Sequence, residues 1–202
     1  MKNLLINVVS TAIKAGDKIL SYYNDTSFTI KEDQSPLTEA DIQSNLIIKN
    51  ELNSFSNYNI LSEEGAKIDW TIRRKWSNFW IVDPLDGTKE FLKKNGEFTV
   101  NIALIENNIP KMGIIYAPAL KTVYYGLKDH GSFKHKIIDN RTKIDFFSES
   151  NKITCNNDAL NLKLVASRSH PSKELNDWLL KYNNYELLDA GSSLKFCLVA
   201  EG

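Results

Sequence analysis

A continuous apolar run that stops at a group of acidic and small residues constrains this chain more than any other feature. Residues 79–82 read Phe-Trp-Ile-Val, which is the length of a strand and apolar at every position. Such a run predicts a strand buried on both faces of its sheet. Residues 83–88, Asp-Pro-Leu-Asp-Gly-Thr, follow directly. We therefore expect the strand to end at residue 82 and the chain to turn there.

The turn at residues 83–88 has the composition of a ligand site. Asp83 and Asp86 lie three residues apart, Pro84 fixes one φ angle, and Gly87 allows backbone to approach a ligand closely. Hard divalent cations need such a cluster of oxygen ligands. The N–H groups of Gly87 and Thr88, at the start of an expected helix, could face an anion. The motif favours adjacent metal and phosphate sites, and an ordinary Asp-Gly turn is the alternative.

Two further acidic sites precede the turn. Glu63 and Glu64 follow an expected strand, and a solvated surface turn is their alternative role. Asp41 lies three residues after Thr38, a spacing that predicts a capping box at the start of a helix. Taken singly, none of these carboxylates identifies a function.

Hydrophobic periodicity and turn residues predict the remaining elements of the first part of the chain. We expect helices over 2–23, from 38 to about 55, and from about 89, a short helix or loop within 67–78, and strands over 28–31, 59–62, 98–105, 111–116 and 122–127.

The pattern changes after residue 133. Residues 134–161 are polar and irregular, whereas residues 162–202 predict strand, helix, strand and a last helix from Ser192 or Ser193. The sequence thus predicts an α+β metal- and phosphate-binding part over 1–133 and an α/β part over 134–202.

Composition excludes some classes of function. Lys plus Arg and Asp plus Glu each number 25 in 202 residues, so the formal net charge is zero. This balance argues against nucleic-acid binding by phosphate neutralisation and against a polybasic membrane anchor. Two cysteines are too few for a disulfide framework, and no segment is long and apolar enough to span a bilayer. We expect a cytoplasmic protein, with attachment to the inner face of the membrane as an alternative.

Taken together, the acidic segments resemble a known family. Residues 35–41 (Ser-Pro-Leu-Thr-Glu-Ala-Asp), 61–64 (Leu-Ser-Glu-Glu) and 83–91 resemble the inositol monophosphatase superfamily of metal-dependent phosphatases, in order and in spacing. Residues 95–105 and 191–202 are similar to its bacterial 3′(2′),5′-bisphosphate nucleotidase branch. The resemblance covers essentially the whole chain and implies a layered α/β/α/β/α fold.

The resemblance also implies a metal site. Glu63, Asp83 and the carbonyl of Leu85 match the ligands of a first metal, and Asp83 and Asp86 match ligands of a second. Family members use Mg²⁺, two or three ions per active site. The local chemistry agrees, because every candidate ligand atom is an oxygen.

Catalytic and substrate contacts carry over in the same way. Thr88 and Asp41 match the pair that orients and helps to deprotonate the attacking water. The resemblance implies that Glu63 is a third catalytic residue. The resemblance implies substrate contacts at Glu63 and along residues 85–88, that is, at Leu85, Asp86, Gly87 and Thr88.

In the nucleotidase branch the substrate is adenosine 3′,5′-bisphosphate, which yields AMP and phosphate. Arg168, Ser192 and Lys195 are candidate nucleotide contacts, and Arg168 could equally be an ordinary surface arginine. We expect His170 to begin a helix or lie on the surface rather than act as a base. An inositol or other sugar phosphatase, an inactive metal- or nucleotide-binding remnant, and a metal-free structural domain are the alternatives.

One expected residue has no counterpart. The family pattern includes a further Asp ligand beyond the last helix, and this sequence ends at Gly202. We expect the sequence to be a fragment, with a naturally truncated form as the alternative. The resemblance leaves open whether the protein is a monomer or a homodimer.

Overall fold

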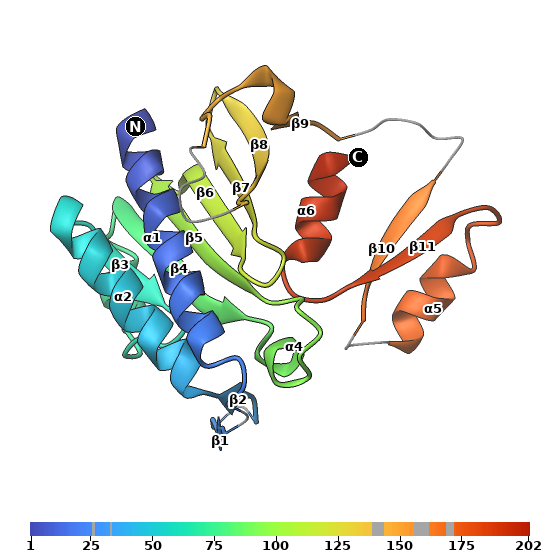
Figure 1. Cartoon of the computed structure of the whole chain (residues 1–202), viewed down its shortest axis with the longest axis horizontal. Helices are drawn as coiled ribbons and strands as arrows, with labels where there is room; N and C mark the ends of the chain where they lie inside the picture. The colour runs from blue at the N-terminus through green and yellow to red at the C-terminus, as the bar shows by residue number, and fades with distance from the viewer. Residues whose placement is uncertain (26, 33, 139–143, 156–161, 169–171) are drawn as a thin grey trace.

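Helices and sheets alternate in five layers (Figure 1). The computed structural model describes residues 1–25, 27–32, 34–138, 144–155, 162–168 and 172–202. Helices α1 (Lys2–Ser21) and α2 (Glu39–Phe55) form the first layer. A seven-stranded sheet, helix α6 (Leu194–Glu201), a two-stranded sheet and helix α5 (Lys173–Leu179) follow in that order. This arrangement confirms the expected layered α/β/α/β/α fold.

The large sheet builds the core with the first two helices. Its strand order is β3-β4-β5-β6-β7-β8-β9, with β3 and β4 parallel and all other neighbours antiparallel. The apolar face of α1 is buried against the sheet, with Leu5, Val8 and Ile19 fully shielded from solvent. The strands span Asn59–Ser62, Asn78–Asp86, Thr99–Glu106, Ile109–Ala117, Thr122–Leu127, Gly131–Lys136 and Lys152–Ile153.

Short elements connect this framework. Strands β1 (Thr29–Ile30) and β2 (Pro36–Leu37) pair with each other ahead of α2. Helix α3 (Trp70–Arg73) lies between β3 and β4, and helix α4 (Thr88–Leu92) follows β4. The expected helices and strands of the first part are confirmed, with shifts of a few residues at their ends.

The expectation that β4 ends at residue 82 is wrong. The strand continues to Asp86, and its pairing with β5 shifts register: Asp83 pairs with Asn101 and Asp86 with Thr99. Two residues of β4, Pro84 and Leu85, therefore lie opposite one residue of β5, which is a β-bulge. A proline is tolerated there because a bulge leaves a residue outside the hydrogen-bond ladder.

The bulge determines where the two aspartates point. In a regular strand, residues three apart face opposite sides of the sheet. The extra residue cancels that inversion, because the β5 partners of Asp83 and Asp86 are only two residues apart. Asp83 and Asp86 therefore emerge on the same face, at the end of β4 that leads into α4.

The sequence suggested that residues 134–136 are irregular, and this expectation is wrong. They belong to β8, which pairs with β7 and, through Ser132 and Phe133, with β9. The expected division between residues 133 and 134 falls inside this strand. A 3-10 turn over Glu149–Asn151 precedes β9.

The last part confirms the expected strand–helix–strand–helix order. Strands β10 (Lys163–Ser167) and β11 (Glu186–Ala190) are parallel neighbours. Helix α6 lies between them and the large sheet, and α5 covers their other side (Figure 1). Within the described ranges, no helix is long and apolar enough to cross a membrane.

Candidate metal and phosphate site

Polar side chains of helix α2 form hydrogen bonds with the ends of β3 and β4 that carry the acidic residues. The buried Ser44 hydroxyl donates to the carbonyl of Pro84 at 2.7 Å, which fixes the bulge. Asn45 donates its amide N–H to the carbonyl of Glu64 at 3.0 Å and accepts from the Ser62 hydroxyl at 2.8 Å. One helix thus positions the acidic ends of both β3 and β4. Neither Ser44 nor Asn45 was a candidate, because a serine and an asparagine within a helix have no local sequence signal of such contacts.

Asp41 caps helix α2 and also contacts Thr88. Its Oδ2 accepts from the backbone N–H of Thr38 at 2.8 Å, and the Thr38 hydroxyl accepts from the Asp41 N–H, so the expected capping box is confirmed. Its Oδ1 accepts from the Thr88 hydroxyl at 3.3 Å. Burial is the main reason why the pKa of Asp41 is raised, with hydrogen bonds from Thr38 opposing the shift. Helix capping and contact with Thr88 are therefore compatible in one carboxylate.

The Asp83 carboxyl group has one buried oxygen that no hydrogen-bond donor in the described part of the chain reaches. Its Oδ1 is shielded from solvent and has no hydrogen-bond partner among the described residues. Burial, followed by the charges of Glu63 and Asp86, raises the pKa of Asp83 to about 8. A buried carboxylate oxygen without a donor is costly unless a cation binds it.

Lys31 neutralises the acidic end of β3. Its ammonium group lies 3.2 Å from Glu63 Oε1 and also forms an ion pair with Glu64. The Glu63 side chain is 50% exposed, whereas that of Glu64 is 10% exposed. Glu63 is thus the carboxylate of this pair that can reach a ligand, and Glu64 is part of the interior. Lys31 was not a candidate, because its partners lie more than 30 residues away in the sequence.

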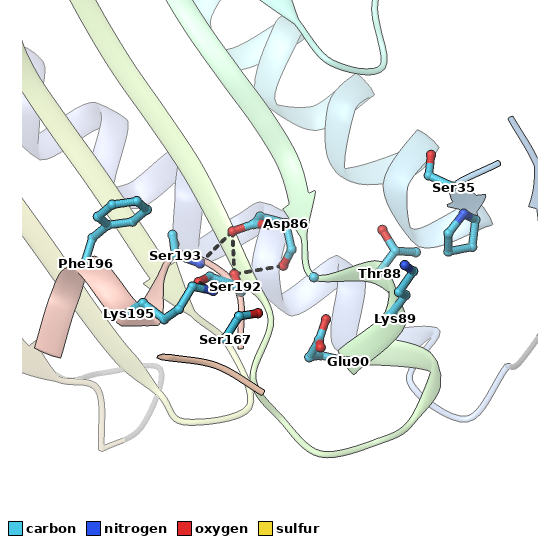
Figure 2. Close-up of a pocket in the computed structure, with 12 residues that line it drawn as sticks. Ser35, Asp86, Thr88, Lys89, Glu90, Ser167, Ser192, Ser193, Lys195 and Phe196 are labelled. Carbon is cyan, nitrogen blue, oxygen red and sulfur yellow. Dashed lines mark hydrogen bonds between the residues drawn. The ribbon is translucent and has the colours of Figure 1, made fainter. Parts of the chain in front are cut away.

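Asp86 faces the last part of the chain. Its Oδ2 accepts from the Ser192 hydroxyl and from the Ser193 N–H, both at 2.6 Å, and its carbonyl accepts from Ser192 at 3.1 Å (Figure 2). The fully buried Thr99 hydroxyl lies 2.8 Å from both serine hydroxyls. These contacts connect the end of β4 to the start of α6.

A pocket of about 370 Å³ opens beside these residues. It brings together the candidates Asp86, Gly87, Thr88, Ser192 and Lys195, while Asp41 reaches it through Thr88. Gly87 has a φ of 90°, and a Cβ there would lie 3.1 Å from the carbonyl oxygen of Glu97. The wall also includes residues that were not candidates, namely Ser35, Pro36, Lys89, Glu90, Ser167, Ser193 and Phe196.

The candidate ligand atoms are all oxygens, which suits a hard cation, but their side chains are not gathered around one point. Among the described residues, no group of three or more His, Cys, Asp or Glu side chains is arranged to hold a metal ion. Asp86 is hydrogen-bonded to Ser192 and Ser193 through Oδ2, and Glu63 forms an ion pair with Lys31. The uncompensated oxygen of Asp83 is the feature that fits a bound cation.

The candidate nucleotide contacts separate into two groups. Ser192 and Lys195 line the pocket, and Lys195 donates to the Ser192 carbonyl at 2.7 Å. Arg168 is not part of the pocket wall and pairs with Glu97. His170 lies outside the described residues.

Comparison with known proteins decides the family. The profile of the inositol monophosphatase family matches residues 1–202. The chain belongs to the inositol monophosphatase family. A 3′(2′),5′-bisphosphate nucleotidase CysQ of Salmonella typhimurium (strain LT2) is 39% identical over an alignment of 203 positions, which covers 98% of this chain and 77% of the relative. A protein of the same name from Buchnera aphidicola subsp. Acyrthosiphon pisum is 41% identical, over 100% of this chain and 73% of the relative.

Solved structures agree with this membership. The crystal structure of CysQ from Bacteroides thetaiotaomicron, described as a bacterial member of the inositol monophosphatase family, matches with a TM-score of 0.84 and 40% identity. The match covers 100% of this chain and 78% of that one. An inositol monophosphatase of Thermotoga maritima, at 23% identity and a TM-score of 0.78, shares the fold.

Proposed function

We propose that this chain is a Mg²⁺-dependent phosphomonoesterase that hydrolyses the 3′-phosphate of adenosine 3′,5′-bisphosphate to give AMP and phosphate. The observation that carries the proposal is the buried Asp83 Oδ1, which has no hydrogen-bond partner among the described residues, in a carboxyl group whose pKa is raised by burial and by Glu63 and Asp86. Asp86, Gly87 and Thr88, which follow Asp83 in the chain, line the pocket. Relatives at about 40% identity that bear the nucleotidase name support the choice of reaction.

The proposed metal ligands are Glu63, Asp83, Asp86 and the carbonyl of Leu85. Bound Mg²⁺ would supply Lewis-acid chemistry, lowering the pKa of a water molecule and offsetting the charge of the phosphate. The protein holds the ligand oxygens ready on the same face of β4, because the bulge turns Asp83 and Asp86 to one side. Such preorganisation reduces the rearrangement needed when the cation binds.

Thr88 and Asp41 form the proposed water-orienting pair. The Thr88 hydroxyl donates to Asp41 Oδ1, so its own oxygen remains able to accept a hydrogen bond from a water molecule. A water held in this way presents its lone pair to the phosphorus and passes a proton towards Asp41 through Thr88. The capping contacts of Thr38 to the other oxygen keep Asp41 in place during the transfer.

The phosphate would lie along residues 86–88. The left-handed conformation of Gly87 allows close approach of backbone, and helix α4 begins at Thr88. Its first N–H groups are suited to phosphate oxygens. Ser192 and Lys195, on the opposite wall, are the proposed contacts for the rest of the nucleotide.

Phosphate release from several substrates tests this function. We expect the purified full-length protein to cleave adenosine 3′,5′-bisphosphate far faster than inositol 1-phosphate, to lose activity in EDTA and to regain it with Mg²⁺. The variant Asp86→Asn should be inactive, whereas Asp177→Asn, at an exposed position of α5, should match wild type.

Two outcomes contradict the proposal. Faster release from inositol 1-phosphate would identify a sugar phosphatase. Mg²⁺ binding without turnover of any phosphomonoester would identify a non-catalytic binding protein.

A further inference from the structure

Glu97 lies where three separate segments of the chain meet. Its Oε2 accepts from Arg168 Nε at 2.8 Å and from the Gly191 N–H at 2.9 Å, and its Oε1 accepts from Arg168 Nη2 at 3.0 Å. Glu97 precedes β5, Arg168 follows β10, and Gly191 follows β11. We call these three residues the Glu97 junction.

Arg168 is held on two sides. Besides the bidentate contact with Glu97, its Nη2 donates to the carbonyl of Asp189 at 2.6 Å. Its backbone N–H donates to the carbonyl of Ala190 at 3.3 Å. The guanidinium group therefore connects Glu97 to the end of β11. A phosphate that bound Arg168 in a bidentate manner through Nε and Nη2 would have to break this pair, and Arg168 does not line the pocket.

The Glu97 junction is adjacent in the chain to two residues that hydrogen-bond to Asp86, a proposed metal ligand. Gly191 is followed by Ser192 and Ser193, which donate to Asp86 Oδ2 at 2.6 Å each. The turn is held from β5 at two points, since Glu97 binds Gly191 and Thr99 contacts both serines. Ser192 has a φ of 54°, a left-handed conformation that surrounding contacts must maintain.

We infer that Glu97 and Arg168 are positioning residues, which act through the turn at residues 191–193 to orient the Asp86 carboxylate, and that Arg168 is not a substrate contact. This inference rests on the proposed function, since Asp86 is there a ligand of Mg²⁺. Ligating carboxylates depend on the groups that hydrogen-bond to them, and loss of such partners typically lowers metal affinity or activity about 10- to 100-fold.

The two roles of Arg168 predict opposite kinetics. If it positions Asp86, Glu97→Gln and Arg168→Met should have the same effect: kcat falls about 10- to 100-fold and the Mg²⁺ concentration for half-maximal activity rises, with little change in the KM for nucleotide. Adenosine 3′,5′-bisphosphate and adenosine 3′-monophosphate should be affected equally, because the 5′-phosphate is not bound by Arg168. Arg168→Lys, which cannot donate in a bidentate manner, should lie between wild type and Arg168→Met.

The matched control is Glu51→Gln. Glu51 pairs with Lys14 at 2.9 Å between α1 and α2, away from the turn, so this variant should behave as wild type. Thermal unfolding confirms that each variant is folded. If Glu97→Gln does not fold, the two Arg168 variants decide, because that side chain is 47% exposed.

Mg²⁺ binding by calorimetry on the same variants separates this inference from the proposed substrate. Weaker Mg²⁺ binding in both Glu97→Gln and Arg168→Met supports the inference whichever phosphomonoester the wild type hydrolyses. A rise in KM confined to the bisphosphate and to the Arg168 variants would overturn it. So would wild-type kinetics and Mg²⁺ binding in both variants.

Discussion

At the scale of single residues, ionisation of Asp83 has opposite effects on the stability of the metal-free protein and on cation binding. In the unfolded chain it titrates near the ordinary 3.8, whereas in the folded protein its pKa is about 8. A folded-state pKa raised in this way means that the metal-free protein loses stability as the pH rises from about 4 to about 8. The negative charge of Asp83 lowers the stability of the metal-free protein, and the same charge would attract a bound cation.

The variant Asp83→Asn tests both effects, on stability and on Mg²⁺ binding. In EDTA it should unfold at nearly the same temperature as wild type at or below about pH 4, and at an increasingly higher temperature than wild type as the pH rises to 8, because asparagine carries no charge. Added Mg²⁺ should stabilise wild type but not the variant. Thermal unfolding across this pH range is the measurement, and Asp177→Asn, on the exposed side of α5, should respond to Mg²⁺ as wild type does. Equal Mg²⁺ stabilisation of Asp83→Asn would remove Asp83 from the metal site.

Thr88 provides a second test at this scale. Replacing it with valine removes the hydroxyl that contacts Asp41, while Asp41 keeps its contacts with Thr38 and the fold is retained. Loss of one proton-transfer partner should lower kcat about 10²- to 10⁴-fold with little change in KM. Thr88→Ser should restore most of the activity. If steady-state kinetics show that valine and serine are equally active, the hydroxyl has no role in orienting the water.

At the scale of elements, the β-bulge in β4 is the feature that the sequence did not predict. The Asp-Pro step after an apolar run is typical of a strand end, and pairing with β5 continues past it only because one extra residue is accommodated. The capping box at Thr38 and Asp41 was predictable, because it depends on residues three apart. The bulge depends on a partner strand and on Ser44 of α2, which are distant in sequence.

The contact between α2 and the bulge can be tested at Ser44. Ser44→Ala leaves the Pro84 carbonyl without its buried donor, so the free energy of unfolding should fall by about 1–3 kcal/mol. Activity should fall as well, because the bulge carries both aspartates. Ser54→Ala on the same helix removes an exposed bond to the Glu51 carbonyl and should change stability by less than about 0.5 kcal/mol. Urea unfolding of the two variants provides the comparison, and equal effects would contradict a specific role for Ser44.

At the scale of the whole molecule, the layer order was expected from the resemblance to the inositol monophosphatase superfamily, whereas the sheet edge formed by β8 and β9 was not predicted. Helix α1 and strands β5 to β7 carry recurring apolar residues, and α2 was predicted mainly from its capping box. Strand β8 reads Gly-Ser-Phe-Lys-His-Lys and buries only Phe133, so no alternation of polar and apolar residues marks it. Its pairing comes from its neighbour β7, a contact that local patterns do not encode.

At Gly191 the turn after β11 packs against α4 and the segment before β5, which makes this glycine a test of how the last part of the chain is joined to the rest. A Cβ there would lie 2.8 Å from Glu90 Cγ and 3.0 Å from both Glu97 Cβ and Oε2. Gly191→Ala should therefore push the turn at residues 191–193 away from β5 and lower the free energy of unfolding by about 1–3 kcal/mol. Activity should fall further than stability alone explains, because Asp86 loses its contacts with Ser192 and Ser193. Gly113→Ala is the matched control, since a Cβ at that position of β6 meets nothing within 4 Å. Urea unfolding and phosphate release are measured on both variants, and a fully active Gly191→Ala would show that the end of β4 works independently of the turn before α6.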